Sequence, residues 1–251
     1  MPALVDCHAH LADPAFDADR AEVLERARQA GIARVVAVGE TLAEARRILE
    51  LTRLHPELLA AAGLYPTHLD PDQAVAVEEL IRRERGRLAA IGEVGLDYWK
   101  VQDEAGREVQ RAIFSRFVRL AVELDLPLNV HSRSCGRQVI DLLLELGARR
   151  VQLHAFDGKA SSALPAVEAG FHFSIPASVV RSEQKQKLVR RLPLDRLLLE
   201  TDSPVLSPVP GERNEPANAA LALAKIAELK GLPAVEVAEA IAANTARLYP
   251  A

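Results

Sequence analysis

Six side chains of the kind that bind divalent metals are distributed along this 251-residue chain. They are His8, His10, Glu93, His131, His154 and Asp202. Imidazole and carboxylate groups together suit borderline divalent metals. Four histidines and two carboxylates are more than one tetrahedral ion needs, whereas two ions that share a bridging carboxylate would use all six. Two ions about 3.5–4 Å apart can together activate a water molecule and stabilise the leaving oxygen of a phosphoester.

Each of these residues, taken alone, also has an explanation without a metal. The sequence Asp-x-His-x-His at 6–10 could be a polar strand end, and a histidine such as His131 or His154 could be hydrogen-bonded and structural. The glycines that flank Glu93 could mark a tight turn, and Asp202 could form a turn or cap a helix. The choice between these explanations depends on whether the fold brings the six residues together.

The elements that must position these residues alternate between short β-prone runs and longer segments with helical spacing. The expected strands lie at residues 3–7, 34–38, 58–64, 88–92, 127–130, 151–156, 172–175 and 197–200. The expected helices lie at about 20–30, 42–53, 72–85, 104–124, 136–146, 159–169, 182–191, 217–230 and 234–246. Alternating strands and helices form parallel βαβ units, and continuous apolar runs suit strands that are buried on both faces. Eight such units predict an α/β fold, a single closed (β/α)₈ TIM barrel over residues 1–251 rather than an open doubly wound sheet.

In such a barrel, all six residues fall at or near the carboxyl ends of their strands. Those ends converge on one mouth, where the active sites of TIM barrels lie. Residues far apart in the sequence therefore meet around one point. This convergence favours a metal centre over six independent structural roles.

Weaker candidates for substrate contacts lie at the same end of the barrel. Arg133, at the end of the fifth strand, is a candidate phosphate clamp because its guanidinium fork suits phosphate oxygens. A surface salt bridge is the alternative for this side chain. His68 follows the third strand, and Arg213 lies in the loop after the eighth. Arg213, together with Lys100 and Arg181, could line a groove for a nucleic-acid backbone.

The composition limits the classes of protein to consider. Hydrophobic residues make up 49% of the chain, enough for a sizeable core, and a net charge of −4 argues against a protein that coats nucleic acid through bulk charge. Two cysteines do not make a disulfide framework, and neither a signal-peptide pattern nor an apolar run of about 18 residues is visible. We therefore expect a cytoplasmic protein with no membrane association and no stable protein partner.

Over essentially its whole length, the sequence resembles the TatD family of metal-dependent deoxyribonucleases, within the amidohydrolase-like barrels. The motifs that carry the resemblance are DCHAHL (6–11), GEVGLDY (92–98), HSR (131–133), HAFDG (154–158), ETDSP (200–204) and RNEP (213–216). As an ordered set these motifs are highly specific, whereas Asp-x-His-x-His alone would indicate only the broader superfamily.

The resemblance implies a role for each candidate residue. His8, His10 and Asp202 would bind one metal ion, His131 and His154 would bind the second, and Glu93 would bridge the two. Asp202 would also accept a proton from the attacking water. The implied activity is cleavage of DNA, often from the 3′ end, with Mg²⁺ as the usual added metal. A histidine-rich site prefers Zn²⁺ or Mn²⁺ to Mg²⁺ in raw affinity, so the identity of the two divalent ions (Mg, Mn or Zn) stays open.

One departure from the family pattern leaves the substrate open. Many relatives carry Gly-x-His-Pro-His after the third strand, and here Tyr65 and Thr67 replace both histidines. A DNA substrate is the first hypothesis. The second is hydrolysis of another bond by the same metal pair, such as an amide, a lactone or the ester of D-aminoacyl-tRNA, which would make RNA or tRNA the partner. The third is a binding module that no longer catalyses.

Overall fold

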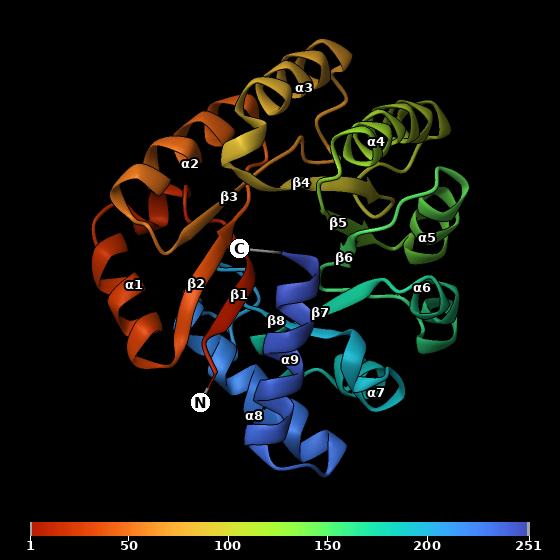
Figure 1. The fold of residues 1–251 in the computed structure, drawn as a ribbon. Helices are drawn as coiled ribbons and strands as arrows, with labels where there is room; N and C mark the ends of the chain where they lie inside the picture. The colour runs from red at the N-terminus through yellow and green to blue at the C-terminus, as the bar shows by residue number, and fades with distance from the viewer. Residues whose placement is uncertain (1, 250–251) are drawn as a thin grey trace.

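The computed structural model describes residues 2–249 and forms one sheet of eight parallel strands in chain order (Figure 1). The strands are β1 (Leu4–Ala9), β2 (Ile32–Ala37), β3 (Leu58–Ala62), β4 (Leu88–Asp97), β5 (Leu128–Arg133), β6 (Val151–Leu153), β7 (His172–Pro176) and β8 (Leu197–Glu200). The segment after β8 returns to β1, since Ala9 bridges Ser203 and the amide of Asp202 donates to the carbonyl of His8. The sheet therefore curls into a barrel, and the predicted TIM-barrel fold is confirmed.

Most of the helices lie around the outside of the barrel in Figure 1, and the last one crosses one end of it, with its final turn near the centre of the view. The helices are α1 (Arg20–Gln29), α2 (Leu42–Leu54), α3 (Pro71–Glu84), α4 (Glu104–Leu124), α5 (Gly136–Glu145), α6 (Leu164–Glu168), α7 (Glu183–Arg191), α8 (Ala219–Lys230) and α9 (Ala234–Leu248). Short 3₁₀ helices occupy Pro14–Phe16, Arg85–Arg87, Ala160–Ala163, Ala177–Val180, Leu194–Arg196 and Pro216–Asn218. Within residues 2–249, no helix combines the length and the apolar character needed to cross a bilayer.

Local sequence explains where several of these helices begin. Thr41 accepts a hydrogen bond from the amide of Glu44 at the start of α2, and Asp103 accepts one from Gly106 at the start of α4. These side chains satisfy amide groups that have no partner within the first helical turn. The helices α2 and α4 therefore begin at fixed residues after β2 and β4, which sets the lengths of the two loops that reach the barrel mouth.

The core has two parts. The larger part packs the outward side chains of the strands against the helices. The smaller part lies inside the barrel, where Cys7, Ala61, Ala90 and Leu198 pack against Leu248 and Tyr249 at the end of α9. Small inward side chains leave room for the end of α9, so this end of the barrel is filled.

Three strands extend at least two residues further toward the mouth than the apolar pattern predicts, whereas β3 and β6 end before the predicted residue. β1 ends at Ala9 rather than Cys7. β4 was expected to end at Gly92 and β5 at Val130, but the ladder between them continues to the pair Asp97 and Arg133. The apolar run stops early because polar side chains face the barrel mouth, while the backbone hydrogen bonding continues. Glu93 and His131 therefore lie within strands rather than in the loops that follow.

Candidate metal centre

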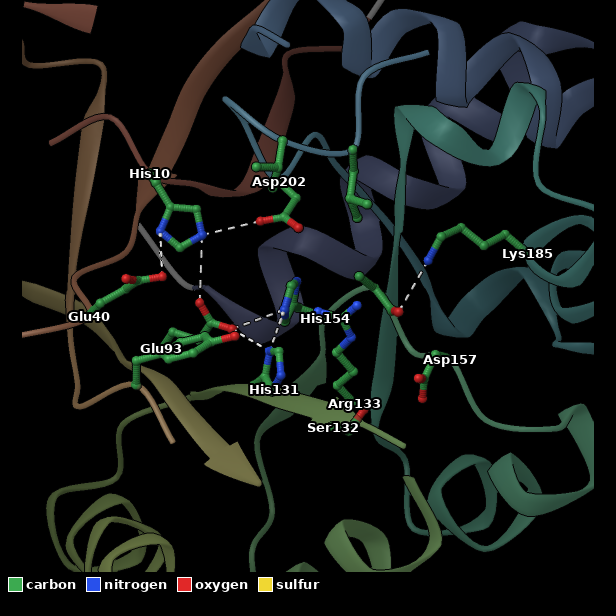
Figure 2. A pocket seen from close by; sticks show the side chains of 14 residues that line it. His10, Glu40, Glu93, His131, Ser132, Arg133, His154, Asp157, Lys185 and Asp202 are labelled. Atoms are coloured by element: carbon green, nitrogen blue, oxygen red, sulfur yellow. Dashed lines mark hydrogen bonds and ion pairs between the residues drawn. The ribbon is translucent and has the colours of Figure 1, made fainter. Parts of the chain in front are cut away.

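A cavity of about 460 Å³ opens at the carboxyl ends of the strands (Figure 2). Five of the six predicted ligands line it, and His8 lies beneath them, fully buried. The lining residues are His10, Glu40, Tyr65, Glu93, His131, Ser132, Arg133, His154, Ala155, Asp157, Lys185, Asp202, Val205 and Leu206. The structure thus brings all six predicted ligands to one place.

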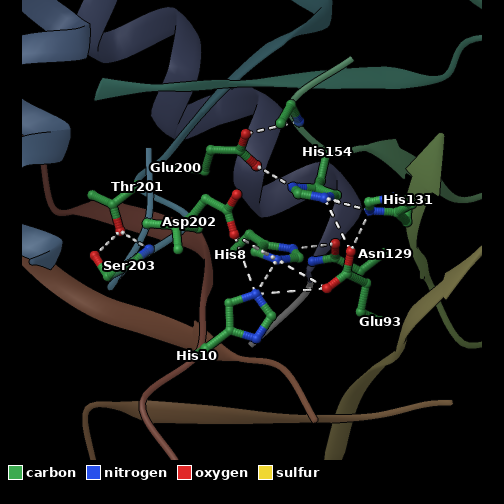
Figure 3. Close-up of polar contacts among 12 residues, drawn as sticks. His8, His10, Glu93, Asn129, His131, His154, Glu200, Thr201, Asp202 and Ser203 are labelled. Carbon is green, nitrogen blue, oxygen red and sulfur yellow. Dashed lines mark hydrogen bonds and ion pairs between the residues drawn. The ribbon is translucent and has the colours of Figure 1, made fainter. Parts of the chain in front are cut away.

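The two oxygens of Glu93 face two separate pairs of histidines (Figure 3). Its Oε2 lies 3.5 Å from Nε2 of His8 and 3.6 Å from Nε2 of His10. Its Oε1 lies 2.8 Å from Nδ1 of His131 and 3.1 Å from Nε2 of His154. Three trios have ligand atoms within 4.8 Å of one another, close enough to hold a metal ion: His8, His10 and Glu93; Glu93, His131 and His154; and His8, His154 and Asp202. Glu93 belongs to the first two trios, which is the position of a bridging carboxylate.

Asp202 completes the first of these groups. Its Oδ1 lies 3.2 Å from Nε2 of His10 and 3.5 Å from Nε2 of His8. A left-handed backbone at Asp202, with φ of 59°, turns the chain after β8 and directs the carboxylate toward the cavity. Three donors from β1 and the segment after β8 therefore converge with Glu93 from β4.

The hydrogen bonds of the imidazoles decide which ring nitrogens are free to bind a metal. Asn129 donates its side-chain N–H to the carbonyl of Cys7, so its Oδ1, 2.8 Å from Nδ1 of His8, acts as the acceptor. His8 therefore carries its hydrogen on Nδ1 and presents the lone pair of Nε2 to Glu93. His131 likewise donates from Nε2 to Asp97, at 3.1 Å, and presents the lone pair of Nδ1.

These imidazole lone pairs point at carboxylate oxygens, which are also electron-rich. A cation between an imidazole nitrogen and a carboxylate oxygen would therefore be attracted to both. Glu93 Oε2 is buried and has no hydrogen-bond partner among the described residues. Buried polar atoms normally have a partner, and an ion at this position would supply one. The donor set therefore fits divalent metal ions.

The charges at the mouth reinforce one another. Burial alone would raise the pKa of Glu93, but His154, His8 and His131 outweigh that effect and hold the pKa well below its usual range. Burial would lower the pKa of His10, but the hydrogen bond to Asp202 and the charge of Glu93 raise it to about 9. The site therefore keeps its carboxylates ionised and favours positive charge at its centre.

Groups behind the candidate ligands hold them in position, as Figure 3 shows for several of them. Asp6 accepts hydrogen bonds from the amides of His8 and Thr201 and from the hydroxyl of Thr201, which ties β1 to the segment that carries Asp202. Burial raises the pKa of Asp6 to about 8. Glu200 accepts from the amide of Ala155, next to His154. Such supporting bonds fix the orientation of a ligand.

Sequence analysis overlooked Asn129 and the supporting roles of Asp97 and Glu200. Asn129 precedes His131 by two residues on β5, so the alternation of the strand places both side chains on the inward face. A buried amide at that spacing was the available indication of a supporting group.

Sequence analysis also overlooked Lys185, which reaches the cavity from α7 and donates from Nζ to the carbonyl of Ala155 at 3.2 Å. Burial lowers the pKa of this ammonium. Lys185 precedes the buried residues Leu188 and Val189 by three and four positions, so it shares their face of the helix. That spacing could have distinguished it from the solvent-facing lysines of the same segment.

The structure separates the three predicted substrate contacts. Arg133 lines the cavity, and within residues 2–249 no carboxylate lies at ion-pairing distance from it. His68 and Arg213 do not line the cavity. Arg213 is instead bound to Asp19 at 2.6 Å, at the start of α1. Loop position indicated the correct end of the barrel for these two residues but not the direction of their side chains.

A barrel of parallel strands whose mouth gathers four imidazoles and two carboxylates defines a class, the metal-dependent hydrolases of the TIM-barrel type. The sequence model of the family described as TatD related DNase matches residues 5–250, and the chain belongs to this family.

Individual relatives match over nearly the whole chain. Deoxyribonuclease TATDN3 of Homo sapiens is 45% identical, over 98% of this chain and 94% of its own length. An uncharacterized metal-dependent hydrolase of Bacillus subtilis, YabD, is 34% identical over 98% of both chains. Among solved structures, the TatD homolog YJJV of Escherichia coli superimposes with a TM-score of 0.92 at 29% identity, over 99% of this chain and 98% of its own.

Proposed function

We propose that this protein hydrolyses the phosphodiester bonds of DNA, removing nucleotides from the 3′ end with two divalent cations. His8, His10 and Asp202 would hold one ion, His131 and His154 the other, and Glu93 would bridge them. The observation that carries the proposal is the division of Glu93, whose two oxygens face two separate histidine pairs. The relatives named deoxyribonuclease support the choice of DNA.

When bound, the two ions would supply Lewis-acid activation of water and of the scissile phosphate. The residues of the chain supply the rest. The carboxylate of Asp202 faces the cavity and would accept the proton of the attacking water. Burial would raise the pKa of Asp202, but the hydrogen bond from His10 and the nearby imidazoles lower it, so the carboxylate is ionised and able to act as a base.

Two positively charged side chains in the cavity, Arg133 and Lys185, would bind the substrate phosphates. Arg133 approaches from β5 and Lys185 from α7, on the side of the cavity away from His10 in Figure 2. A guanidinium fork can bind two phosphate oxygens, and an ammonium acts as a point charge. Together they would hold a phosphate over the histidines without taking part in proton transfer.

The size of the cavity supports attack on a chain end. Small-molecule sites measure about 300–1,000 Å³, and this cavity measures about 460 Å³. That volume suits a terminal nucleotide better than a length of duplex.

Both cysteines are free and buried, which suits the cytoplasmic location that we also propose.

The test is hydrolysis of single-stranded DNA that carries a label at its 5′ end, with Mg²⁺, Mn²⁺ or Zn²⁺ added in turn. We expect a ladder that shortens from the 3′ end and disappears in the His131→Ala variant. Cleavage no greater than that of the variant with every metal would overturn the proposal. Release of the labelled 5′ nucleotide without intermediate lengths would retain the nuclease and overturn the polarity.

One observation keeps a second substrate in the test. Tyr65 lines the cavity with its ring centroid 5.0 Å from that of His131, where many relatives carry a histidine. The same assay therefore includes D-aminoacyl-tRNA and simple amide and lactone substrates. Faster turnover of one of these than of DNA would favour that activity.

A further inference from the structure

Trp99 is an exposed aromatic residue at the rim of the cavity, in the turn that follows β4. It is the single tryptophan of the chain, and its exposed fraction is 50%. The guanidinium of Arg133 lies 3.8 Å from the centroid of its ring, and the ammonium of Lys100 lies 4.7 Å from it. Arg133 also lines the cavity, so this rim cluster (Trp99, Lys100 and Arg133) continues from the candidate metal centre onto the surface.

The rim cluster is held in a fixed position relative to the centre. The amides of Trp99 and Lys100 both donate to Oδ1 of Asp97, at 3.0 and 2.8 Å. The other oxygen of Asp97 lies 3.1 Å from Nε2 of His131. One carboxylate therefore orients both the turn that carries the indole and a candidate metal ligand.

The charges of the rim cluster are not paired with carboxylates in the part of the chain that the structure describes. Among residues 2–249, neither Arg133 nor Lys100 has a carboxylate within ion-pairing distance, whereas many other arginines of this surface pair with acids, such as Arg82 with Glu123. An exposed indole beside two unpaired cations is complementary to a ligand that is both aromatic and anionic. Single-stranded nucleic acid has this chemistry, since its bases stack on aromatic and guanidinium planes while its phosphates meet the cations.

We propose that Trp99 and Arg133 form a stacking platform for an unpaired nucleobase of the DNA strand whose end occupies the cavity. This inference rests on the proposed function and adds to it a contact with the strand at the rim, beside the cavity. Stacking on an aromatic plane tolerates any base, so the platform selects unpaired strands rather than a sequence. A paired base is unavailable to it because both of its faces are already stacked within the duplex.

The single tryptophan makes a direct test possible. The metal-loaded protein is titrated with a phosphorothioate oligonucleotide, which resists hydrolysis, and the emission of Trp99 is recorded. We expect a saturable change in emission with the single strand. We expect none with an oligonucleotide of the same length that lacks bases, and a much weaker response with the blunt duplex. Equal responses to the normal and the base-free strand would overturn the platform.

Variants measure the contribution of stacking to affinity, read from the anisotropy of a dye-labelled single strand. Stacking on one aromatic side chain implies that Trp99→Ala weakens binding about 5- to 150-fold, while Trp99→Phe keeps most of it. Leu54→Ala, at an exposed apolar residue of α2, is the matched control and leaves affinity unchanged. A Trp99→Ala affinity within twofold of the wild type, with an unchanged thermal midpoint, would overturn the inference.

The two proposals fail separately. Cleavage of the ordinary phosphodiester strand without any response of Trp99 removes the platform and leaves the nuclease. Absence of cleavage with every metal removes the proposed function whatever Trp99 does.

Discussion

Two histidines at opposite ends of the barrel, the half-buried His10 and the buried His172, show how differently the ends are built. At the mouth, the hydrogen bond to Asp202 and the charge of Glu93 outweigh burial and raise the pKa of His10 to about 9. At the start of β7, burial together with Arg196 and Arg247 lowers the pKa of His172 to about 4. The mouth therefore attracts positive charge, and the amino end repels it.

The polar groups of the two ends differ in the same way. Inside the amino half of the barrel, Asn129, Gln152 and Tyr249 bond to one another and to the carbonyl of Cys7. At the mouth, Glu93 Oε2 has no hydrogen-bond partner among residues 2–249. Both ring nitrogens of His172, at the amino end, also lack a partner there, but this imidazole is uncharged above about pH 4. The unpartnered oxygen at the mouth instead belongs to an ionised carboxylate that faces two imidazoles, so it is the mouth that is suited to bind a cation.

The largest effect is expected at the bridge between the histidine pairs. Glu93→Gln removes the charge that faces both pairs, and hydrolysis of DNA falls by about 10³-fold or more. The thermal midpoint stays the same or rises, because a charge buried for function is not needed for folding. Rates and metal content per chain are measured together, with Glu25→Gln on the surface of α1 as control. A variant that keeps both full activity and full metal content would contradict the comparison.

A smaller effect is expected at Asp97, which contacts a candidate metal ligand but is not one itself. Asp97→Asn keeps the shape of the side chain but removes the charged acceptor of the His131 N–H. Apparent affinity for the added metal falls about 10- to 100-fold, and a high metal concentration restores the rate. The measurement is a titration of activity with Mn²⁺. An unchanged titration midpoint would show that His131 does not depend on this carboxylate.

The low pKa of His172 predicts a dependence of stability on pH at the amino end. Between about pH 4 and the unfolded value of 6.5, the unfolded chain binds a proton that the folded chain does not, so stability rises with pH in this window. As pH falls from 6.5 to 4, about 2 kcal/mol is lost after allowance for solvent screening. Unfolding in urea at several pH values tests this, and His172→Phe should flatten the profile. A profile with the same slope in the variant would assign the dependence to other groups.

The smallest effect is expected within the filled interior. Tyr249→Phe removes the hydroxyl that donates to Gln152 and accepts from Asn129. The free energy of unfolding falls by about 1 kcal/mol, while the rate of DNA hydrolysis per folded molecule stays unchanged. Urea unfolding and the DNA assay are run on the same preparation. A loss of activity at constant stability would mean that the two ends are coupled.

Most of the fold could be predicted from the sequence, because parallel strands that are buried on both faces appear as continuous apolar runs. That pattern located all eight strands, and the barrel geometry then placed six dispersed ligand-type residues at one mouth. It could not locate the ends of β4 and β5, because hydrogen bonding there continues through Glu93 and His131 after the apolar run has ended.

Side-chain direction is the part that spacing could not supply. Arg133 ends β5 and Arg213 lies in the loop after β8, but the first faces the cavity and the second pairs with Asp19, a residue of a different loop. Lys185 was hidden for the opposite reason, since a lysine in a polar helix resembles a solvated one. Its spacing to Leu188 and Val189 places it on the buried face of α7, and the structure adds that its ammonium reaches the cavity.

The double attachment of Asp97 has a consequence for engineering and for natural variation. A substitution that changes the turn at Trp99 also disturbs Asp97, the carboxylate that orients His131. We therefore expect such a substitution to change the preference for DNA strands and the affinity for metal at the same time. Lys185 comes from α7 and shares no bond with Asp97. It offers an independent position at which substrate preference could diverge among relatives while the metal requirement is conserved.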